Sequence, residues 1–501
     1  MAVYLYVILG YLLVLTGFNI YRSRQIKSQD DFMVAGRSLS MTKMVFTLVC
    51  TWIGSGTFIA GAEFASYAGW SAVWQPAGAF LGIALIYFVA AKIRTFGQYT
   101  IGDILEVRYG KFARLFGAIA LIIAFTTIVS YQFRAGGEIL NVVTDGAISP
   151  ETGQTIAAIF VILFVTIGGM VAVAHTDLPN GIIIVSACLL AVPFVIVAAG
   201  GWAHPHEVLR PSYFQVFSPD FGKYPALKAL GYFLSTLLLL LGVQSMYQKF
   251  YSARTPAEAK KAVAIWIVGT IVVETIVICI AVFAYSYNVE HGMNWSGRSL
   301  VLNAARHMVP GPVGVLLLGA ACAVVLSTGM NYLLSCSSNI VRDIYQKMIN
   351  PAANPDKMIV LQKSFIVIMG FCAFLMIFIP TYYRSEISVL QYAFFAYTIY
   401  GVAVTPALLA ALTWKRATRQ GGLASIVGGA AAAVFFEVLM PRLAPSVMVG
   451  TDAWGIPSIY PAAIISIGLL VIVSLMTPAP TPKELERLFP GTATAARKVA
   501  M

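Results

Sequence analysis

Gly54-Ser55-Gly56 interrupts an otherwise apolar stretch that covers residues 41–70. Glycine lets a helix unwind, and an unwound backbone leaves carbonyl oxygens without their helical partners. Lipid cannot satisfy such oxygens, so at membrane depth they must line a buried site or a watery cavity. Broken helices of this kind coordinate sodium ions in membrane proteins. The pattern predicts a cation site here, and close packing of two helices through small residues is the alternative.

A polar stripe marks a second apolar stretch, residues 313–341. Its members recur at helical spacing and therefore share one face of a helix; they are Ser327, Thr328, Asn331, Ser335 and Ser338. Such a stripe should face protein or water rather than lipid. Ser327 and Thr328 can direct two hydroxyls at one point, and a hard cation prefers oxygen ligands. Hydrogen bonding between helices without an ion is the alternative.

A second interruption, Gly242-Val243-Gln244-Ser245, lies near the end of the apolar stretch 227–249. It holds the same place in a second set of five spans that the Gly54 break holds in the first set. The two interrupted spans run in opposite directions through the membrane. This arrangement predicts two inverted repeats, at about residues 41–203 and 227–413, around a central site.

The elements that must position these residues are membrane-spanning helices. The chain has 501 residues, of which 59% are hydrophobic and 11% charged, whereas soluble domains carry about 25% charged residues. The apolar stretches are about 20 residues long, enough to cross a bilayer as helices. We expect an all-α polytopic protein with a single membrane domain at 1–477 and a cytoplasmic tail at 478–501. The thirteen predicted spans are 2–21, 41–70, 71–93, 113–141, 154–174, 178–203, 227–249, 262–288, 313–341, 358–380, 385–413, 421–440 and 458–477.

The distribution of basic residues predicts the orientation. Of the 33 Lys and Arg residues, 23 lie in loops on one predicted side, 6 lie on the other and 4 lie within spans. Cytoplasmic loops carry the excess of Lys and Arg, which places the N-terminus outside and the C-terminus inside the cell membrane. The net charge of +12 is explained by this pattern, so we expect the lipid bilayer and not a nucleic acid as partner.

Arg134 and Glu274 are ionisable residues within predicted spans, where such residues are functional candidates. Arg134 lies on the fourth span and would favour a carboxylate ligand. Two alternatives stay open. Arg134 can pair with Glu138 one turn away, or an aromatic cage can bind a quaternary ammonium; its residues would be Trp52, Tyr67, Trp70 and Trp74. Glu63 is expected to line an outer vestibule.

Enzymatic chemistry is not indicated. The histidines lie in loops or at span ends, the six cysteines form no CxxC pair, and no phosphate-binding loop is present. We therefore expect neither a catalytic cluster nor ATP as an energy source.

Five segments in order resemble the sodium:solute symporter family over about residues 2–477. They are Gly36-Arg37-Ser38-Leu39; Ile167-Gly-Gly-Met170 with Ala174-His-Thr-Asp177; Tyr247-Gln-Lys249 with Ser252-Ala-Arg254; Leu326-Ser-Thr328 with Arg342-Asp-Ile-Tyr345; and Pro406 with Thr413-Trp-Lys-Arg416. The resemblance implies a fold like that of the bacterial leucine transporter. That fold has a five-plus-five inverted-repeat core, here with one extra N-terminal and two extra C-terminal helices.

The resemblance also implies ion sites. The principal sodium site would use carbonyls of Thr51, Gly54 and Val324 and hydroxyls of Ser327 and Thr328. A second sodium would lie near Asp177 and Asn331, for which helix capping by Asp177 is the alternative. Some members of the family have serines where this chain has Met330 and Asn331.

The function implied is sodium-coupled symport of a small organic solute by alternating access. We favour a monocarboxylate, an amino acid or a similar anion or zwitterion. A choline-like or sugar substrate, or a sensor that has lost transport, is the alternative. The residues expected to contact the solute are Ile53, Ser55, Phe58, Gln75, Arg134 and Gln244. Proline-transporting relatives carry an acid where this chain has Ile53. Sequence leaves the oligomeric state open, and a monomer is the simplest expectation.

Overall fold

The computed structural model describes residues 2–24, 26–383 and 388–492. Almost all of this chain is helical. One small hairpin, in which β1 (Met448–Val449) pairs antiparallel with β2 (Asp452–Ala453), is the exception. The start of the predicted span 385–413 and the end of the predicted tail lie outside the described residues.

The described residues up to 208 contain ten α-helices: α1 (Ala2–Ser23), α2 (Gln29–Val34), α3 (Met41–Trp52), α4 (Gly61–Ala68), α5 (Trp74–Ile86), α6 (Ala90–Phe96), α7 (Ile101–Tyr109), α8 (Lys111–Val143), α9 (Pro150–Ala198) and α10 (His204–Val208). The described residues from 225 onward contain α11 (Pro225–Gly242), α12 (Gln244–Ser252), α13 (Pro256–His291), α14 (Leu300–His307), α15 (Gly311–Ser338), α16 (Pro355–Tyr382), α17 (Val389–Ala403), α18 (Thr405–Thr413), α19 (Arg419–Val434), α20 (Met440–Leu443), α21 (Ile459–Met476) and α22 (Pro482–Leu485). Short 3₁₀ or π-helical segments connect them: η1 (Ala35–Arg37), η2 (Gly56–Ala60), η3 (Gly69–Val73), η4 (Pro211–Phe214), η5 (Pro219–Phe221), η6 (Gly297–Ser299), η7 (Asn339–Ile349), η8 (Phe435–Leu439) and η9 (Pro445–Val447).

Twelve helices of the described chain are long and apolar enough to cross a membrane. The expected count of thirteen is not confirmed, because the predicted spans 41–70 and 71–93 divide differently. The helix over Met41–Trp52 is short, and Gly56–Ile86 counts as one span although Gly69, with φ 58° and ψ −134°, ends α4 beside the predicted boundary. The break at residues 53–55 causes this division.

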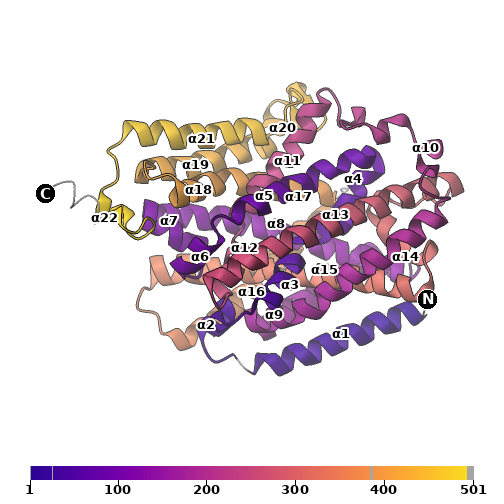
Figure 1. The fold of residues 1–501 in the computed structure, drawn as a ribbon, viewed down its shortest axis with the longest axis horizontal. Coiled ribbons are helices and arrows are strands. Elements are labelled where there is room, and N and C mark those ends of the chain that lie inside the picture. The colour runs from indigo at the N-terminus through magenta and orange to yellow at the C-terminus, as the bar shows by residue number, and fades with distance from the viewer. Residues whose placement is uncertain (1, 25, 384–387, 493–501) are drawn as a thin grey trace.

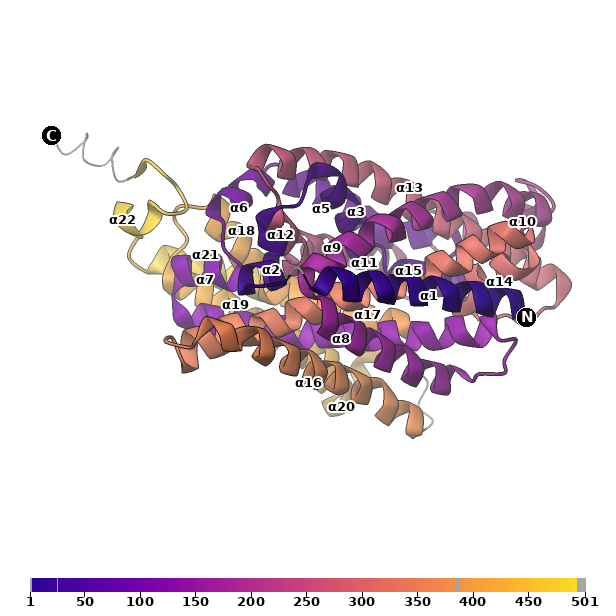
Figure 2. The ribbon, with the colours of Figure 1, turned by 90° about the horizontal axis from the view of Figure 1, so that it is seen from below.

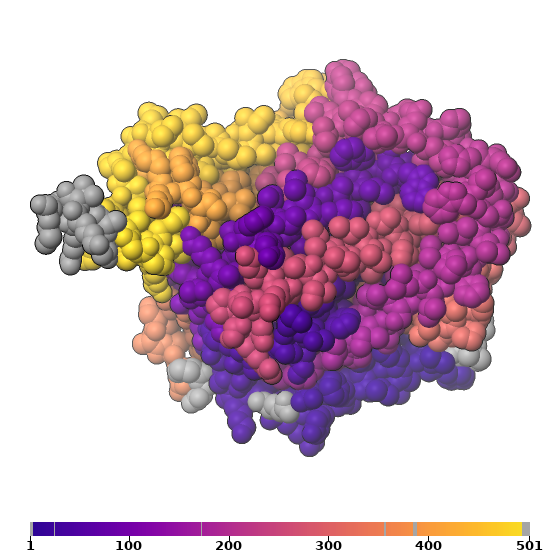
Figure 3. Space-filling view, in the orientation of Figure 1, coloured from indigo at the N-terminus to yellow at the C-terminus, as the bar shows by residue number. Residues whose placement is uncertain are grey.

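The long helices lie side by side along one direction, so that the connections gather at the two ends of the bundle (Figures 1 and 2). Helix α1 begins at the end that carries α10 and α14, on the right in Figure 1, whereas α6, α7 and α22 lie at the opposite end. The first and last described helices therefore mark opposite ends. In Figure 3 the C-terminal helices, in orange and yellow, form a layer along the upper edge of the packed body.

Helix α9 is kinked at Gly169 and contains two candidate membrane spans, Pro150–Val171 and Val173–Ala198, which match the predicted spans 154–174 and 178–203. The backbone of Gly169 has φ 50° and ψ −160°, outside the helical region. A Cβ atom at this position would also lie 2.7 Å from a ring carbon of Phe32. Only glycine combines this conformation with so close an approach, which explains the Gly-Gly pair in the sequence.

Candidate functional site

The first break separates α3 from η2. Helix α3 ends at Trp52, and Ile53 adopts an extended conformation (φ −74°, ψ 99°). The amides of Thr57 and Phe58 both donate to the carbonyl of Gly54, at 3.0 and 3.2 Å, and so start the next helical segment. The carbonyls at the end of α3 must therefore find partners outside their own helix.

Hydroxyls of α15 reach those carbonyls. Ser327 Oγ lies 3.2 Å from the carbonyl oxygen of Cys50. Thr328 Oγ1 lies 3.2 Å from the same oxygen and 3.3 Å from the carbonyl oxygen of Ile53. Two hydroxyls and two carbonyls thus converge in a buried place, a set of hard oxygen donors that fits a sodium ion.

The residues predicted for the principal sodium site gather at this convergence. The carbonyls that the hydroxyls contact belong to Cys50 and Ile53, each one residue before the predicted Thr51 and Gly54. The hydroxyl of Thr51 donates to its own helix, to the Thr47 carbonyl at 2.6 Å. Val324 is buried one turn before Ser327 and Thr328.

Gly54 is required by the closeness of α15. A Cβ atom at residue 54 would lie 2.8 Å from Thr328 Oγ1 and 2.9 Å from Thr328 Cγ2. Real Cβ atoms do not approach this closely, so any larger residue would push α3 and α15 apart. The glycine is therefore a consequence of the hydroxyl–carbonyl contacts and not only a source of flexibility.

Asp177, predicted for a second sodium site, lies directly beside the first. Its Oδ1 accepts a hydrogen bond from Ser327 Oγ at 2.6 Å. Its Oδ2 accepts hydrogen bonds from Thr47 Oγ1 and, at 3.4 Å, from Asn331 Nδ2. Asp177 and Asn331 are thus brought together as predicted, in a network that also contains Lys249.

The second break separates α11 from α12 at Val243, which is also extended (φ −64°, ψ 116°). The backbone groups freed at this break find partners in side chains of α17 and α18. Tyr400 Oη donates to the carbonyl of Gly242 and accepts from the amide of Gln244 at 3.1 Å. Thr405 Oγ1 donates to the carbonyl of Leu238 at 2.7 Å. Both breaks are therefore stabilised by side chains of other helices.

Predicted solute contacts divide into two groups. Ile53, Ser55, Phe58 and Gln75 are buried around the first break. Ser55 donates its amide to Gln132 Oε1 at 3.2 Å, and Gln75 Nε2 lies 3.4 Å from the Gly56 carbonyl. Gln244, in contrast, points toward α7, where its Oε1 accepts from the amide of Ile101 at 3.2 Å.

Arg134 pairs with carboxylates. Its guanidinium lies 3.3 Å from both Glu138 Oε1 and Glu151 Oε1, and 3.4 Å from Gln154 Oε1. These contacts favour the alternative in which Arg134 forms a bridge with Glu138, and they compensate its positive charge. A role in solute binding stays a prediction.

The four aromatic residues considered for a cage have separate partners. Trp74 stacks on Phe217 with ring centroids 5.3 Å apart. Trp70 contacts Trp202, and Tyr67 contacts Phe64. Trp52 Nε1 donates to Glu274 Oε1 at 3.1 Å. Each of the four side chains thus has a different partner, which argues against an aromatic cage formed by these residues.

Glu274 lies at the first break, although it belongs to α13. Besides Trp52, Thr57 donates to its Oε1 at 3.1 Å, so the carboxyl joins the residues on both sides of the break. Its Oε2 is buried without a hydrogen-bond partner in the described chain. The same is true of Ser55 Oγ and Gln132 Nε2. Buried polar atoms are normally satisfied, so these three point to a ligand at the break.

A sequence profile of the sodium:solute symporter family matches residues 32–429. The chain belongs to this family. Among curated relatives, the sodium/proline symporter of Escherichia coli (strain K12) is 25% identical over 495 residues, which cover 95% of this chain and 93% of that protein. The high-affinity proline transporter PutP of Bacillus subtilis (strain 168) is 25% identical over 444 residues, 85% of this chain and 89% of that protein.

Solved structures show the same fold. A Na⁺-coupled sialic acid symporter in a substrate-bound outward-open state gives a TM-score of 0.77 at 15% identity, covering 95% of this chain and 98% of that chain. A nucleobase-cation-symport-1 family transporter in a closed conformation gives 0.60 at 12% identity, covering 91% and 97%. The protein is therefore a multi-pass symporter with the five-plus-five inverted-repeat core expected from its sequence.

A large cavity opens into one end of this symporter. Its volume is about 1370 Å³, and it lies between α4, α11 and α17 and the C-terminal segment from η8 to the start of α21. Glu63, Tyr67, Asp220 and Lys223 are among the residues that line it. Glu63 accepts a hydrogen bond from Ser388 Oγ at 3.0 Å. This is the position expected for a vestibule on the side predicted to be outside.

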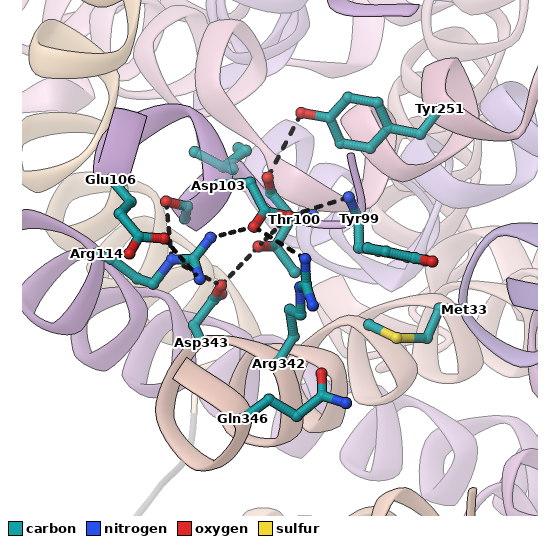
Figure 4. Close-up of polar contacts among 12 residues, drawn as sticks. Met33, Tyr99, Thr100, Asp103, Glu106, Arg114, Tyr251, Arg342, Asp343 and Gln346 are labelled. Atoms are coloured by element: carbon teal, nitrogen blue, oxygen red, sulfur yellow. Dashed lines mark hydrogen bonds and ion pairs between the residues drawn. The ribbon is translucent and has the colours of Figure 1, made fainter. Parts of the chain in front are cut away.

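A charged cluster closes the opposite end (Figure 4). At its centre Arg114 of α8, fully buried, contacts Asp103 of α7 and lies 3.0 Å from Glu106 Oε2. Its Nε lies 3.5 Å from Oδ1 of Asp343 in η7. Arg342 adds a second guanidinium 3.5 Å from Asp103. The cluster ties the first repeat to the end of α15 in the second repeat.

The electrostatics of this inner-end cluster depend on the two arginines. Burial alone would raise the pKa of Asp103, but Arg114, Arg342 and the backbone amides of Tyr99 and Thr100 hold the pKa below its usual value. Asp103 is therefore ionised and paired. Neither Arg114 nor Arg342 was predicted to take part in a charged cluster. The signal that would have found the cluster is an acid and a base, Asp103 and Arg114, flanking the Gly110 turn.

Proposed function

We propose that this protein carries a small zwitterionic solute, of the amino-acid class, into the cell together with sodium by alternating access. The observation that supports sodium as the coupling ion is the convergence of the Ser327 and Thr328 hydroxyls on the carbonyls of Cys50 and Ile53. The residues Thr51, Gly54, Val324, Ser327 and Thr328 would hold the ion. Binding at the break would fix the relative position of α3 and α15, and so link ion binding to the packing of the two repeats.

The solute class follows from the polar atoms at the first break. Ser55 Oγ and Gln132 Nε2 are unpartnered donors that suit a carboxylate, while Glu274 Oε2 is an unpartnered acceptor that suits an amine. Glu274 supplies an acid beside Trp52 and Thr57, at the break that contains Ile53, and proline-transporting relatives carry an acid at the position of Ile53. The curated relatives described above are proline transporters, which supports an amino acid. Because Arg134 is already compensated, a simple monocarboxylate has less support.

The arrangement of cavity and cluster supports a direction. The cavity lies at the end with loop residues 219–224, and the inner-end cluster closes the end with α7 and η7. In this conformation the solute would enter from the cavity side. We place that side outside the cell membrane, with the N-terminus outside and the C-terminus in the cytoplasm, in keeping with the excess of Lys and Arg at the other end.

The test is uptake by the purified protein in proteoliposomes. Radiolabelled L-proline, other amino acids, choline, lactate and glucose are compared under an inward sodium gradient and under an equal potassium gradient. We expect sodium-dependent accumulation of at least one amino acid and none of glucose. Accumulation that is equal in potassium would refute sodium coupling. Sodium-dependent uptake of choline or lactate alone would refute the zwitterion assignment.

A further inference from the structure

Lys249 is a lysine without any exposed surface in the interior of the symporter. It lies in α12, shortly after the second break. Its ammonium donates a hydrogen bond to Asn331 Oδ1 and lies 3.8 Å from the sulfur of Met170. An ammonium removed from water is strongly disfavoured unless a negative charge compensates it.

Asp177 supplies that charge through Asn331. The amide of Asn331 bridges the two, because its oxygen accepts from Lys249 and its nitrogen donates to Asp177 Oδ2 at 3.4 Å. Asp177 is as fully buried as Lys249. The formal charges of the network, one negative and one positive, cancel without any bound ion.

A second sodium ion does not fit this network. Sodium takes oxygen ligands. The side-chain oxygens here are those of Asp177 and Asn331 and the hydroxyls of Thr47 and Ser327, and Ser327 already belongs to the proposed principal site. The side-chain oxygen of Asn331 is already bonded to the ammonium. An ion on Asp177 would leave a net positive charge beside Lys249, and like charges repel strongly where water is excluded. The residues thus disagree with the second sodium that the family resemblance implied.

We propose that the ammonium of Lys249 takes the place of a second coupling cation, so that this symporter binds a single sodium ion at Ser327 and Thr328. The inference extends the proposed function, in which sodium is the coupling ion, and it concerns the number of ions. Lys249 acts as a positioning residue: it holds Asn331, which holds Asp177, whose Oδ1 accepts from the sodium ligand Ser327. Replacing Lys249 by an uncharged residue should therefore create a second sodium site beside Asp177.

The experiment counts bound sodium ions without requiring transport. The melting temperature of the purified full chain is followed against sodium concentration, with potassium chloride keeping ionic strength constant. Each ion bound only by the folded state adds about 1.4 kcal/mol of stability per tenfold rise in sodium above its dissociation constant. We expect the slope for one ion in the wild type and in Lys249→Arg. In Lys249→Met, which leaves the negative charge of Asp177 uncompensated, we expect the slope for two sodium ions.

A double variant controls for misfolding. Lys249→Met combined with Asp177→Asn removes both charges, and we expect it to regain the one-ion slope. A two-ion slope in the wild type would overturn the proposal, and so would a one-ion slope in Lys249→Met. In proteoliposomes the ratio of sodium to solute flux should be one in the wild type. Absence of any sodium-driven uptake would count against the proposed function, whereas the binding slopes would still decide the role of Lys249.

Discussion

At the scale of single residues, the proposed sodium site is made of groups that are ordinary by themselves. Ser327 and Thr328 are common helix residues, and their hydroxyls usually donate to their own backbone. Here they donate to carbonyls of another helix, Cys50 and Ile53. The chemistry therefore lies in the pairing of α15 with the break in α3.

Replacing Ser327 and Thr328 together by Ala should raise the sodium concentration for half-maximal uptake at least tenfold. Both hydroxyl ligands vanish, while the helix propensity of α15 does not suffer. The matched control is Ser337→Ala in the same helix, whose hydroxyl donates to the Leu334 carbonyl at 2.8 Å. Sodium activation curves of uptake provide the measurement. An unchanged curve in the double variant would place the ion elsewhere.

Glu274→Gln should raise the KM for a zwitterionic solute roughly tenfold, the effect of about 1.4 kcal/mol. Glutamine keeps an oxygen for Trp52 and Thr57 but removes the negative charge at the break. Thr270→Val, one turn earlier in α13, is the control, because the Thr270 hydroxyl is also buried and unpartnered in the described chain. Equal effects of the two substitutions would argue for packing instead of charge.

At the scale of elements, the two breaks are held open by neighbouring helices. The first depends on α15 and on Gln132 of α8, and the second depends on Tyr400 and Thr405. A helix is thus interrupted only where another element satisfies the freed backbone groups, as burial demands. At the other end of the bundle, ion pairs join α7, α8 and η7.

Gly54→Ala should abolish sodium-dependent uptake while the protein still inserts and purifies. The new Cβ would meet Thr328 Oγ1 at 2.8 Å, and the two helices would separate at the ion site. Gly319→Ala is the matched control, since a Cβ there meets nothing within 4 Å in α15. Uptake assays and size-exclusion profiles of both variants make the comparison. Normal sodium dependence in Gly54→Ala would show that the contact relaxes without consequence.

Arg114→Gln should lower the melting temperature and expose the inner end. Removing one partner of a buried ion pair costs roughly 3–5 kcal/mol, because the remaining charges stay uncompensated. Here Asp103, Glu106 and Asp343 would lose their shared guanidinium. Adding Asp343→Asn should recover part of the loss by removing one carboxylate. Thermal unfolding of the two variants is the measurement, and a double variant less stable than Arg114→Gln would contradict the charge argument.

At the scale of the whole molecule, the helices form one bundle whose two ends differ in character. One end carries the cavity and the loops around η4 and η5, and the other carries the inner-end cluster and α22. Because the two ends differ, the protein needs one fixed orientation in the membrane, and the distribution of Lys and Arg predicts which end faces the cytoplasm.

Thiol labelling tests the orientation. Cys372 is the exposed cysteine of the described chain, so Cys372→Ala provides the background. Met293→Cys should react with an impermeant maleimide in intact cells, because residues 289–312 are predicted outside. Lys415→Cys should react only after the membrane is permeabilised. The reverse pattern would invert the orientation, and labelling of both would refute the predicted sidedness.

The sequence by itself determined the class of fold, the two breaks and the polar stripe of α15. These are local features: apolar stretches set the helices, glycines set the interruptions, and helical periodicity sets the shared face. It also predicted that Ser327, Thr328 and the Gly54 segment belong together, through the resemblance to the family. The expected count of thirteen spans is not confirmed, because the break after Trp52 leaves Met41–Trp52 as a short helix. The predicted boundary at residues 70 and 71 lies beside Gly69, whose φ of 58° and ψ of −134° end α4.

Only the tertiary structure decided the partners of the buried charges. Glu274 meets Trp52 across 222 residues, Lys249 meets Asn331 across 82, and Arg134 finds Glu151 as well as the neighbouring Glu138. No local pattern encodes such pairs, because a charged side chain in a helix is compatible with many neighbours until packing fixes one. Because water is excluded from these positions, each buried charge must be compensated by the groups that the fold places beside it.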